Sequence, residues 1–226
     1  MPRFKAAPKL YNFTVELKKI ILKKIGFFVI FSILLKKIVN RFLSELFNIV
    51  VVPVFPRHFV RFAKKYYKNN PVSGIEIGTF EGANANSILK ELNIKKIYLI
   101  DPYIEYEDYI KSEKVQTQKC LSIAERNARK RLKKNFNKVI WVRKFSDDAI
   151  KDTPNVVDFI YIDGNHEYEY VIKDMENYWP KIKKGGILAG HDITNFTGVA
   201  KAFVEFCYKK KLKPYISRTD WWVVKK

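Results

Sequence analysis

Residues 74–89 read GIEIGTFEGANANSIL, a short apolar run that ends in a glycine-rich loop and continues as a helical pattern. Gly78 and Gly82 let the backbone turn tightly and approach a ligand, and the helix beyond them offers free N–H groups. The spacing is E-x-G-x-x-x-G. Glu76 at the strand end would repel a pyrophosphate, but its charge suits an amino or sulfonium group. The alternative is a strand–turn–helix unit that binds nothing.

From residue 72 onward, short apolar runs alternate with longer amphipathic stretches. Strands are predicted at 72–77, 96–101, 138–143, 156–162, 186–190, 213–217 and 221–225, and helices at 57–68, 83–92, 112–134, 167–183 and 197–210. Strands separated by helix-length crossovers predict an α/β fold, a doubly wound, Rossmann-like and mostly parallel sheet. Ligands of such sheets bind outside the carboxyl ends of the strands, so functional residues should follow strands directly.

The charge is uneven along the chain. Residues 1–70 hold 15 of the 43 Lys/Arg residues and two of the 23 acids, within a net charge of +20 for the whole chain. We therefore expect a basic, apolar helical extension over 1–70 and a second domain over 71–226. A basic arm suits phosphates or anionic lipid. The alternative is a general excess of solvated lysines.

Residues 12–50 combine apolar runs with a stripe of Lys and Arg, which is typical of a helix lying in a membrane surface. The eleven uncharged residues between Lys24 and Lys36 would span about 16 Å as a helix, too short to cross a hydrocarbon core of ~30 Å. We expect a cytoplasmic protein with peripheral contact at the inner membrane face. A helix that covers the domain or forms a dimer contact is the alternative, so oligomerisation stays open. Two distant cysteines, Cys120 and Cys207, suit a reducing compartment.

Two further polar residues follow predicted strands. Asp101 ends the second strand, where a carboxylate can accept hydrogen bonds from both hydroxyls of a ribose. The alternative for Asp101 is an Asx turn before Pro102. Ser146 follows the third strand and could face an adenine, but it is equally a good helix N-cap.

The stretch YIDGNHEYEY, residues 161–170, contains two further candidate site residues, Asp163 and His166. Asp163 and Asp192 end two consecutive strands, which should bring their carboxylates together. Two such groups repel unless a proton or cation lies between them, and a divalent ion with oxygen ligands is the natural partner. His166, close to Asp163, could act as general base. The alternatives are an N-terminal helix residue for His166 and a cap for Asp192.

Together the stretches GIEIGTFEGANA, YLIDPY, DFIYIDGNHEYEYVIKDMENYWPKIKKGGILAGHD and WWVVKK resemble the class I S-adenosylmethionine-dependent methyltransferases. Within them they are similar to the "methyltransferase domain 24" group, related to the catechol and macrolide-sugar O-methyltransferases. The resemblance covers about residues 70–226. It implies a seven-stranded sheet of order 3-2-1-4-5-7-6, which accounts for the two C-terminal strands.

The resemblance also implies roles for single residues. It implies S-adenosylmethionine contacts from Glu76, Gly78, Thr79, Phe80, Gly82, Asp101, Ser146 and Asp163. Asp163 and Asp192 match two metal-ligand positions of Mg2+-dependent relatives. Those relatives place Asn after the second Asp, where this chain has Ile193, so Thr194 or Asn195 would have to substitute as third ligand. His166 stands where catechol-type enzymes have a basic Lys.

The sequence therefore predicts an O-methyltransferase acting on a hydroxyl of a small molecule or glycan, with Asp163 and His166 as catalytic residues and Mg2+ as a second cofactor. One alternative is an RNA methyltransferase that uses the basic N-terminal arm as a phosphate clamp. Against nucleic acid, the basic residues are interleaved with long apolar runs. The other alternative is a non-catalytic module that binds S-adenosylmethionine.

Overall fold

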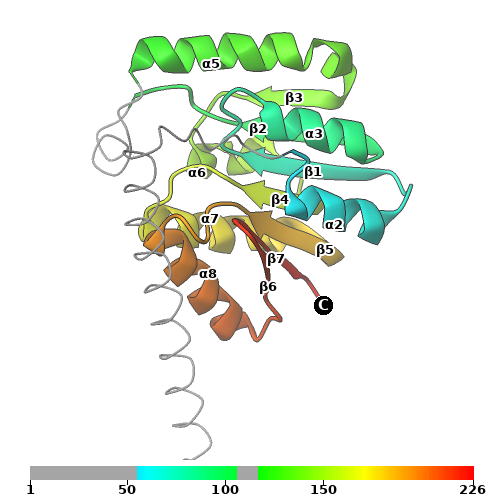
Figure 1. The fold of residues 1–226 in the computed structure, drawn as a ribbon, viewed down its shortest axis with the longest axis vertical. Coiled ribbons are helices and arrows are strands. Elements are labelled where there is room, and N and C mark those ends of the chain that lie inside the picture. Colours follow the sequence, from blue (N-terminus) through cyan, green and yellow to red (C-terminus); the bar gives the residue numbers. More distant parts are fainter. Residues whose placement is uncertain (1–54, 106–116) are drawn as a thin grey trace, which may run out of the picture. The chain divides into compact units, whose positions relative to one another are not determined.

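The computed structural model describes residues 55–105 and 117–226. By its internal contacts the chain divides into Met1–Ile49 and Val50–Lys226, and the described residues all belong to the second unit. They form a seven-stranded sheet with helices on its two faces (Figure 1). The expected membrane-surface helix over 12–50 lies outside the described residues.

The strand order is β3-β2-β1-β4-β5-β7-β6, as predicted. The strands are β1 (Val72–Ile77), β2 (Ile94–Ile100), β3 (Val139–Val142), β4 (Val157–Ile162), β5 (Ile182–Gly190), β6 (Tyr215–Ser217) and β7 (Asp220–Val224). The first five run parallel, whereas β7 pairs antiparallel with both β5 and β6. The chain leaves β3 at one edge and returns as β4 beside β1. This reversal is the point at which doubly wound sheets bind ligands.

Helices connect these strands. They are α2 (His58–Tyr67), α3 (Ala83–Glu91), α5 (Gln118–Arg131), α6 (Ser146–Ala149), α7 (Tyr168–Tyr178) and α8 (Thr197–Lys210), with short 3-10 segments at Lys133–Lys138, Ile150–Asp152 and Trp179–Lys181. Helix α2 packs beside α3 and over β7, and α7 packs beside α8 (Figure 1). Side chains alternate across a strand, so Phe159 and Tyr161 of β4 enter the core under α2 and α3 while Ile160 and Ile162 face the other side.

Two boundaries differ from the sequence prediction. The helix predicted over 167–183 ends at Tyr178, and β5, predicted to start at Gly186, already starts at Ile182 and pairs irregularly with the beginning of β4. The predicted domain boundary at residue 70 separates α2 from a core to which it contributes. Phe59, Val60 and Ala63 are fully buried in that core, so α2 belongs with the sheet, and the compact unit begins earlier.

In the described part of the chain, no helix is both long and apolar enough to cross a membrane. The two cysteines are unpaired, with Cys120 exposed and Cys207 buried.

Candidate active site

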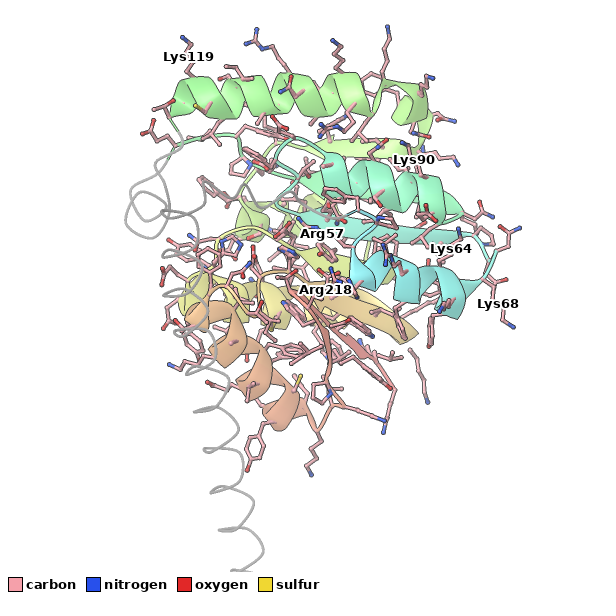
Figure 2. All side chains as sticks on the ribbon, viewed as in Figure 1. Arg57, Lys64, Lys68, Lys90, Lys119 and Arg218 are labelled. Carbon is pink, nitrogen blue, oxygen red and sulfur yellow. The ribbon has the colours of Figure 1, made fainter. Side chains whose placement is uncertain are left out.

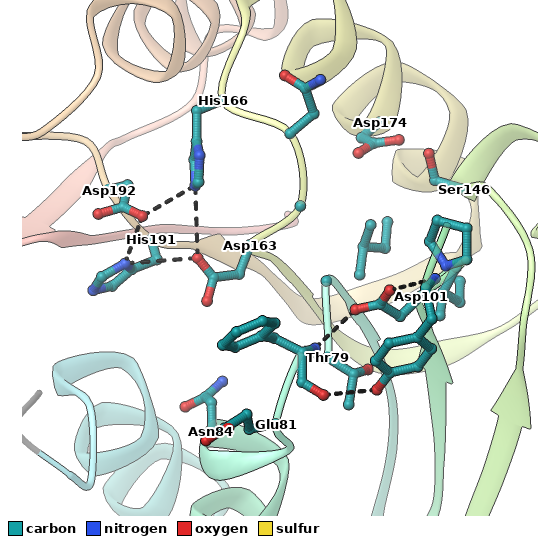
Figure 3. A pocket seen from close by; sticks show the side chains of 18 of the residues that line it. Thr79, Glu81, Asn84, Asp101, Ser146, Asp163, His166, Asp174, His191 and Asp192 are labelled. Atoms are coloured by element: carbon teal, nitrogen blue, oxygen red, sulfur yellow. Dashed lines mark hydrogen bonds and ion pairs between the residues drawn. The ribbon is translucent and has the colours of Figure 1, made fainter. Parts of the chain in front are cut away.

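A cavity of about 430 Å³ opens at the carboxyl ends of the central strands. Most of the residues that the sequence singled out line it: Gly78, Thr79, Phe80, Asp101, Ser146, Asp163, His166 and Asp192 (Figure 3). They follow five different strands, β1 to β5, so the sheet edge brings together positions far apart in the chain. Glu76 and Gly82 are not part of the wall.

The loop after β1 lines the cavity with Gly78, Thr79 and Phe80. Gly78 has φ +84°, and a Cβ there would lie 2.1 Å from the backbone oxygen of Asp163, so no side chain fits. Gly82 has φ +69°, and a Cβ there would meet Ala128 of α5 at 3.2 Å. Gly78 therefore permits close approach of two site loops, and Gly82 permits close approach of two helices.

Glu76 lies beneath this loop with only 1% of its surface exposed. Its Oε1 accepts a hydrogen bond from Asn84 Nδ2 at 2.9 Å, while Oε2 has no hydrogen-bond partner in the described part of the chain. Burial raises the pKa of Glu76 to about 8. The carboxyl group is thus held mostly neutral below the cavity, and direct contact with the cofactor stays a prediction.

Asp101 joins the loops that follow β1 and β2. Its two carboxylate oxygens accept hydrogen bonds from the backbone N–H of Phe80 at 2.8 Å and of Tyr103 at 2.9 Å. The Tyr103 hydroxyl donates back to the Phe80 carbonyl at 2.8 Å. Burial raises the pKa of Asp101. A carboxylate has about four acceptor sites, more than these bonds use, so the turn and a ribose contact are compatible.

Ser146 begins α6 and lies beside Asp174 of α7 (Figure 3). Asp174 lines the cavity and is 5% exposed. Burial raises its pKa to about 7, against the opposing effect of a hydrogen bond with Ser146. Asp174 is not among the site residues predicted from the sequence. The feature that could have revealed it is an acidic residue on the buried face of α7, in helical register with Val171, Met175 and Tyr178.

Asp163, His166 and Asp192 meet at the other end of the cavity, as the strand pattern predicted. The Nε2 atom of His166 lies 3.0 Å from Asp192 Oδ2 and 3.9 Å from Asp163 Oδ1. The His166 ring stacks on Phe196, with centroids 4.2 Å apart and planes inclined by 7°. The stacking partner and the Asp192 carboxylate together orient the imidazole.

His191, which was not predicted from the sequence, joins the same cluster. Its Nδ1 lies 3.1 Å from Asp192 Oδ2 and 3.6 Å from Asp163 Oδ1. Asp163, His191 and Asp192 each offer a ligand atom, and these three atoms lie within 4.8 Å of one another. The family resemblance implied Thr194 or Asn195 as the third ligand. Neither lines the cavity, and the Asn195 side-chain amide donates to Asp192 Oδ1.

Arg57 reaches the site from the segment before α2. Its NH1 atom donates to Asp163 Oδ2 at 2.6 Å and to the Tyr161 hydroxyl at 3.0 Å. In Figure 2 Arg57 lies among the central elements, while Lys68 and Lys119 project from the edges of the fold. The Tyr161 hydroxyl donates onward to Asp220 at 3.1 Å. No local motif marks Arg57, because its role depends on how α2 packs across the sheet.

The charges of this cluster hold both carboxylates ionised. Burial alone would raise the pKa of Asp163, but the Arg57 charge, a hydrogen bond with His166 and the His191 charge outweigh it and lower the pKa. Burial likewise opposes ionisation of Asp192, and hydrogen bonds with His166 and His191 hold its pKa well below its usual value. At neutral pH this end of the cavity therefore carries two ionised carboxylates, surrounded by the side-chain nitrogen atoms of one arginine and two histidines.

Comparison with known proteins identifies the class. The family model described as "Methyltransferase domain" (Methyltransf_24) matches residues 75–193, more than half of the chain. The chain therefore belongs to this family of S-adenosylmethionine-dependent methyltransferases. Arg57 and Asp220 lie outside the matched segment.

One relative comes from Acanthamoeba polyphaga mimivirus and carries the name "Uncharacterized protein R132". It is 28% identical over 148 residues, which make up 62% of this chain and 59% of the relative. The matched segment thus spans less than two thirds of that protein.

Solved structures share the fold. The O-methyltransferase NovP superposes with a TM-score of 0.56 at 16% identity, over 74% of this chain and 78% of NovP. An O-methyltransferase from Bacillus cereus, solved in complex with SAH, gives 0.56 at 14% identity, over 83% and 97%. An rRNA methylase from Streptococcus thermophilus gives 0.51 at 13% identity, over 76% and 99%. These likenesses support the fold and do not distinguish one acceptor from another.

Proposed function

We propose that this protein is an O-methyltransferase that transfers the methyl group of S-adenosylmethionine to a hydroxyl of a small molecule or glycan. The observation that carries the proposal is the division of a single cavity. Asp101 and Ser146 line one end, and Asp163, His166 and Asp192 line the other. A nucleoside at the first end would place its sulfonium group toward the second.

The acceptor end offers the groups that deprotonation of a hydroxyl requires. His166 takes the proton, since an imidazole titrates near neutral pH. Asp192, 3.0 Å from its Nε2, holds the ring in place and stabilises the imidazolium that forms. S-adenosylmethionine, when bound, supplies an electrophilic methyl group on sulfur. The acceptor oxygen forms a bond to that carbon as the carbon–sulfur bond breaks, and much of the rate comes from holding the two in line.

A divalent cation fits the same end of the cavity. Asp163, His191 and Asp192 would hold it, since their ligand atoms already converge and carboxylates are ordinary ligands of such ions. A bound cation would lower the pKa of the acceptor hydroxyl. The Mg2+ expected from the family resemblance belongs to this proposal, and complete loss of activity on chelation would support it.

The direct test is methyl transfer from labelled S-adenosylmethionine into extracts fractionated into small molecules, glycans, lipids and RNA. Label in the small-molecule or glycan fraction supports the proposal. Label confined to RNA, with steeply salt-dependent binding, supports the nucleic-acid alternative instead. Cofactor binding with no transfer to any fraction would make the chain a binding module.

Peripheral membrane contact is a separate proposal, because residues 12–50 lie outside the described residues. It rests on the basic stripe and apolar runs of that segment. Flotation of the full chain with vesicles that contain anionic lipid tests it, and deletion of residues 12–50 should abolish flotation.

A further inference from the structure

Positive charge in the sheet domain is concentrated in one short segment. Residues 119–144 hold ten Lys/Arg and one acid, Glu125. Residues 71–118 hold five Lys/Arg and eight acids, and residues 145–226 hold thirteen and twelve. Without 119–144 the acids of the domain would outnumber its Lys and Arg residues. A general enrichment in lysine therefore does not explain this segment.

The segment covers most of α5, the 3-10 segment Lys133–Lys138 and the edge strand β3. Arg126, Lys130, Lys133 and Lys134 are exposed, and we call these four residues the α5 basic surface. The first three lie four and three positions apart, so they share one side of a helix, while the opposite side of α5 is buried. In Figure 2, Lys119 projects from this helix away from the sheet.

Internal contacts leave the charges of the α5 basic surface unpaired. In the part of the chain that the structure describes, no acid forms an ion pair with any of the four residues. Glu125 instead pairs with Arg129 at 2.8 Å and with Arg143 at 3.2 Å. Like charges four positions apart, such as Arg126 and Lys130, destabilise a helix. The helix dipole favours cations only in the last turn of α5, and the surface extends beyond that turn. Stability of the fold thus does not account for the α5 basic surface.

Two large apolar side chains lie among these charges. Ile123 of α5 is 37% exposed, and Phe136 of the 3-10 segment is 48% exposed. Basic side chains beside exposed aliphatic and aromatic groups are typical of surfaces that bind in the headgroup region of a membrane. Anionic lipid supplies the complementary charge, and each Lys or Arg near it strengthens the attraction.

The position of the surface favours lipid over a nucleic-acid substrate. The 3-10 segment leads into the amino end of β3, whereas the cavity opens at the carboxyl ends of the strands. Among the described residues that line the cavity, Arg57 is the only Lys or Arg, and it is bound to Asp163. A nucleic acid that enters the cavity needs phosphate contacts around it. A membrane contact acts at a distance and leaves the cavity open.

We propose that the α5 basic surface, together with the two apolar side chains beside it, docks the protein to membranes that contain anionic lipid. This surface extends the proposed membrane contact to the folded domain, and it is independent of the methyltransferase activity. Stable anchoring takes two weak signals, and residues 12–50 would supply the other one.

The test is quantitative binding of the full chain to two kinds of vesicle, phosphatidylcholine alone and phosphatidylcholine mixed with phosphatidylserine. One variant combines Lys130→Gln, Lys133→Gln and Lys134→Gln, which removes three charges from the surface. We expect this variant to bind the vesicles that contain phosphatidylserine about a hundredfold more weakly than the wild type. On phosphatidylcholine alone the two proteins should not differ. Calorimetry with S-adenosylhomocysteine checks that the variant is folded.

The matched control combines Lys209→Gln, Lys210→Gln and Lys211→Gln. These exposed lysines lie at the end of α8, so the control loses the same charge from a different helix and should bind nearly as well as the wild type. Equal losses in the two variants would show that binding follows total charge and would overturn the inference. Wild-type binding in the first variant would overturn it as well. So would binding to polyuridylate that depends on the α5 lysines, without binding to vesicles.

Two further measurements separate this surface from the earlier proposals. Methyl transfer to a soluble acceptor should be unchanged in the first variant, because none of its three lysines lines the cavity. Absence of transfer in the wild type would remove the proposed activity, whereas vesicle binding that depends on the α5 lysines would still support docking. If deletion of residues 12–50 leaves vesicle binding intact and the first variant loses it, the α5 basic surface alone carries the membrane contact.

Discussion

The two ends of the cavity hold their acidic groups by different means. At the end lined by Asp101 and Ser146, backbone N–H groups and neutral side chains contact the acids, and burial raises the pKa of Asp101 and brings that of Asp174 to about 7. At the other end a guanidinium and two imidazoles surround Asp163 and Asp192 and lower both pKa values. One end suits hydrogen bonding to a neutral nucleoside, and the other keeps fixed negative charge for a cation or a proton.

Burial alone therefore does not decide whether a carboxyl group in this fold is ionised. Asp163 and Asp174 are both largely withdrawn from water, yet their pKa values move in opposite directions. The difference is the nearby positive charge. Changes at the acceptor end should therefore affect turnover and stability, whereas changes at the nucleoside end should affect cofactor affinity.

The largest expected effect comes from His166→Ala. Loss of a general base should lower the rate of methyl transfer by about 10²–10⁴-fold, with cofactor affinity close to the wild-type value. Single-turnover kinetics and calorimetry with S-adenosylhomocysteine measure the two quantities. An unchanged rate would remove the base role and with it the functional division of the cavity.

Arg57→Met should lower stability, because it leaves Asp163 buried without its counter-ion. Loss of one partner of a buried pair costs about 3–5 kcal/mol in the free energy of unfolding, and the side chains here are 16% exposed, so we expect about 3 kcal/mol. Urea unfolding measures it. Arg61→Met, at an exposed position of α2 four residues further on, should change stability by less than about 0.5 kcal/mol. Equal effects of the two substitutions would refute a special role for Arg57.

Asp101→Ala should weaken cofactor binding by about tenfold to a hundredfold, the effect of losing hydrogen bonds to a charged group. Asp101→Asn keeps one oxygen for the turn and should weaken binding less. Calorimetry with S-adenosylhomocysteine compares them. Wild-type affinity in Asp101→Ala would refute the ribose assignment and leave the Asx turn as the reason for this residue.

A further prediction concerns the pH dependence of stability. Glu76 has its pKa raised from 4.5 to about 8, so the folded state holds this proton more tightly than the unfolded chain does. Its contribution to stability is complete below the unfolded pKa and is lost as the pH rises toward about 8. Glu76→Gln, whose Oε1 can still accept from Asn84, should flatten the fall in stability between about pH 5 and pH 8. Unfolding curves at several pH values test this, and an unchanged slope would contradict it.

Much of this cavity follows from the sequence because consecutive parallel strands end at one edge of a sheet. Asp163 and Asp192 could be placed together for that reason alone, and the glycine spacing of residues 78–82 marked the first loop. The start of β5 could not be found, since Gly185 and Gly186 resemble a helix stop even though they continue a strand.

The missed residues depend on packing between distant segments. Arg57 contacts Asp163 across 106 positions of sequence, and only the seating of α2 on the sheet makes that contact possible. His191 is adjacent to a recognised residue, but the hydroxyl that contacts its Nε2 at 2.8 Å belongs to Thr219, in the segment that leads into β7. Neither relation has a periodicity or spacing that a single sequence reveals.

The absence of a side chain at Gly78 has a consequence for how ligands bind at the two ends of the cavity. The loop after β1 touches the turn at Asp163 backbone to backbone, so a shift of one loop must displace the other. We therefore expect ligands bound at the two ends to be thermodynamically linked, each changing the affinity of the other by the same factor. Titration of Mg2+ with and without S-adenosylhomocysteine measures this coupling, and identical Mg2+ affinities would show that the two loops respond independently.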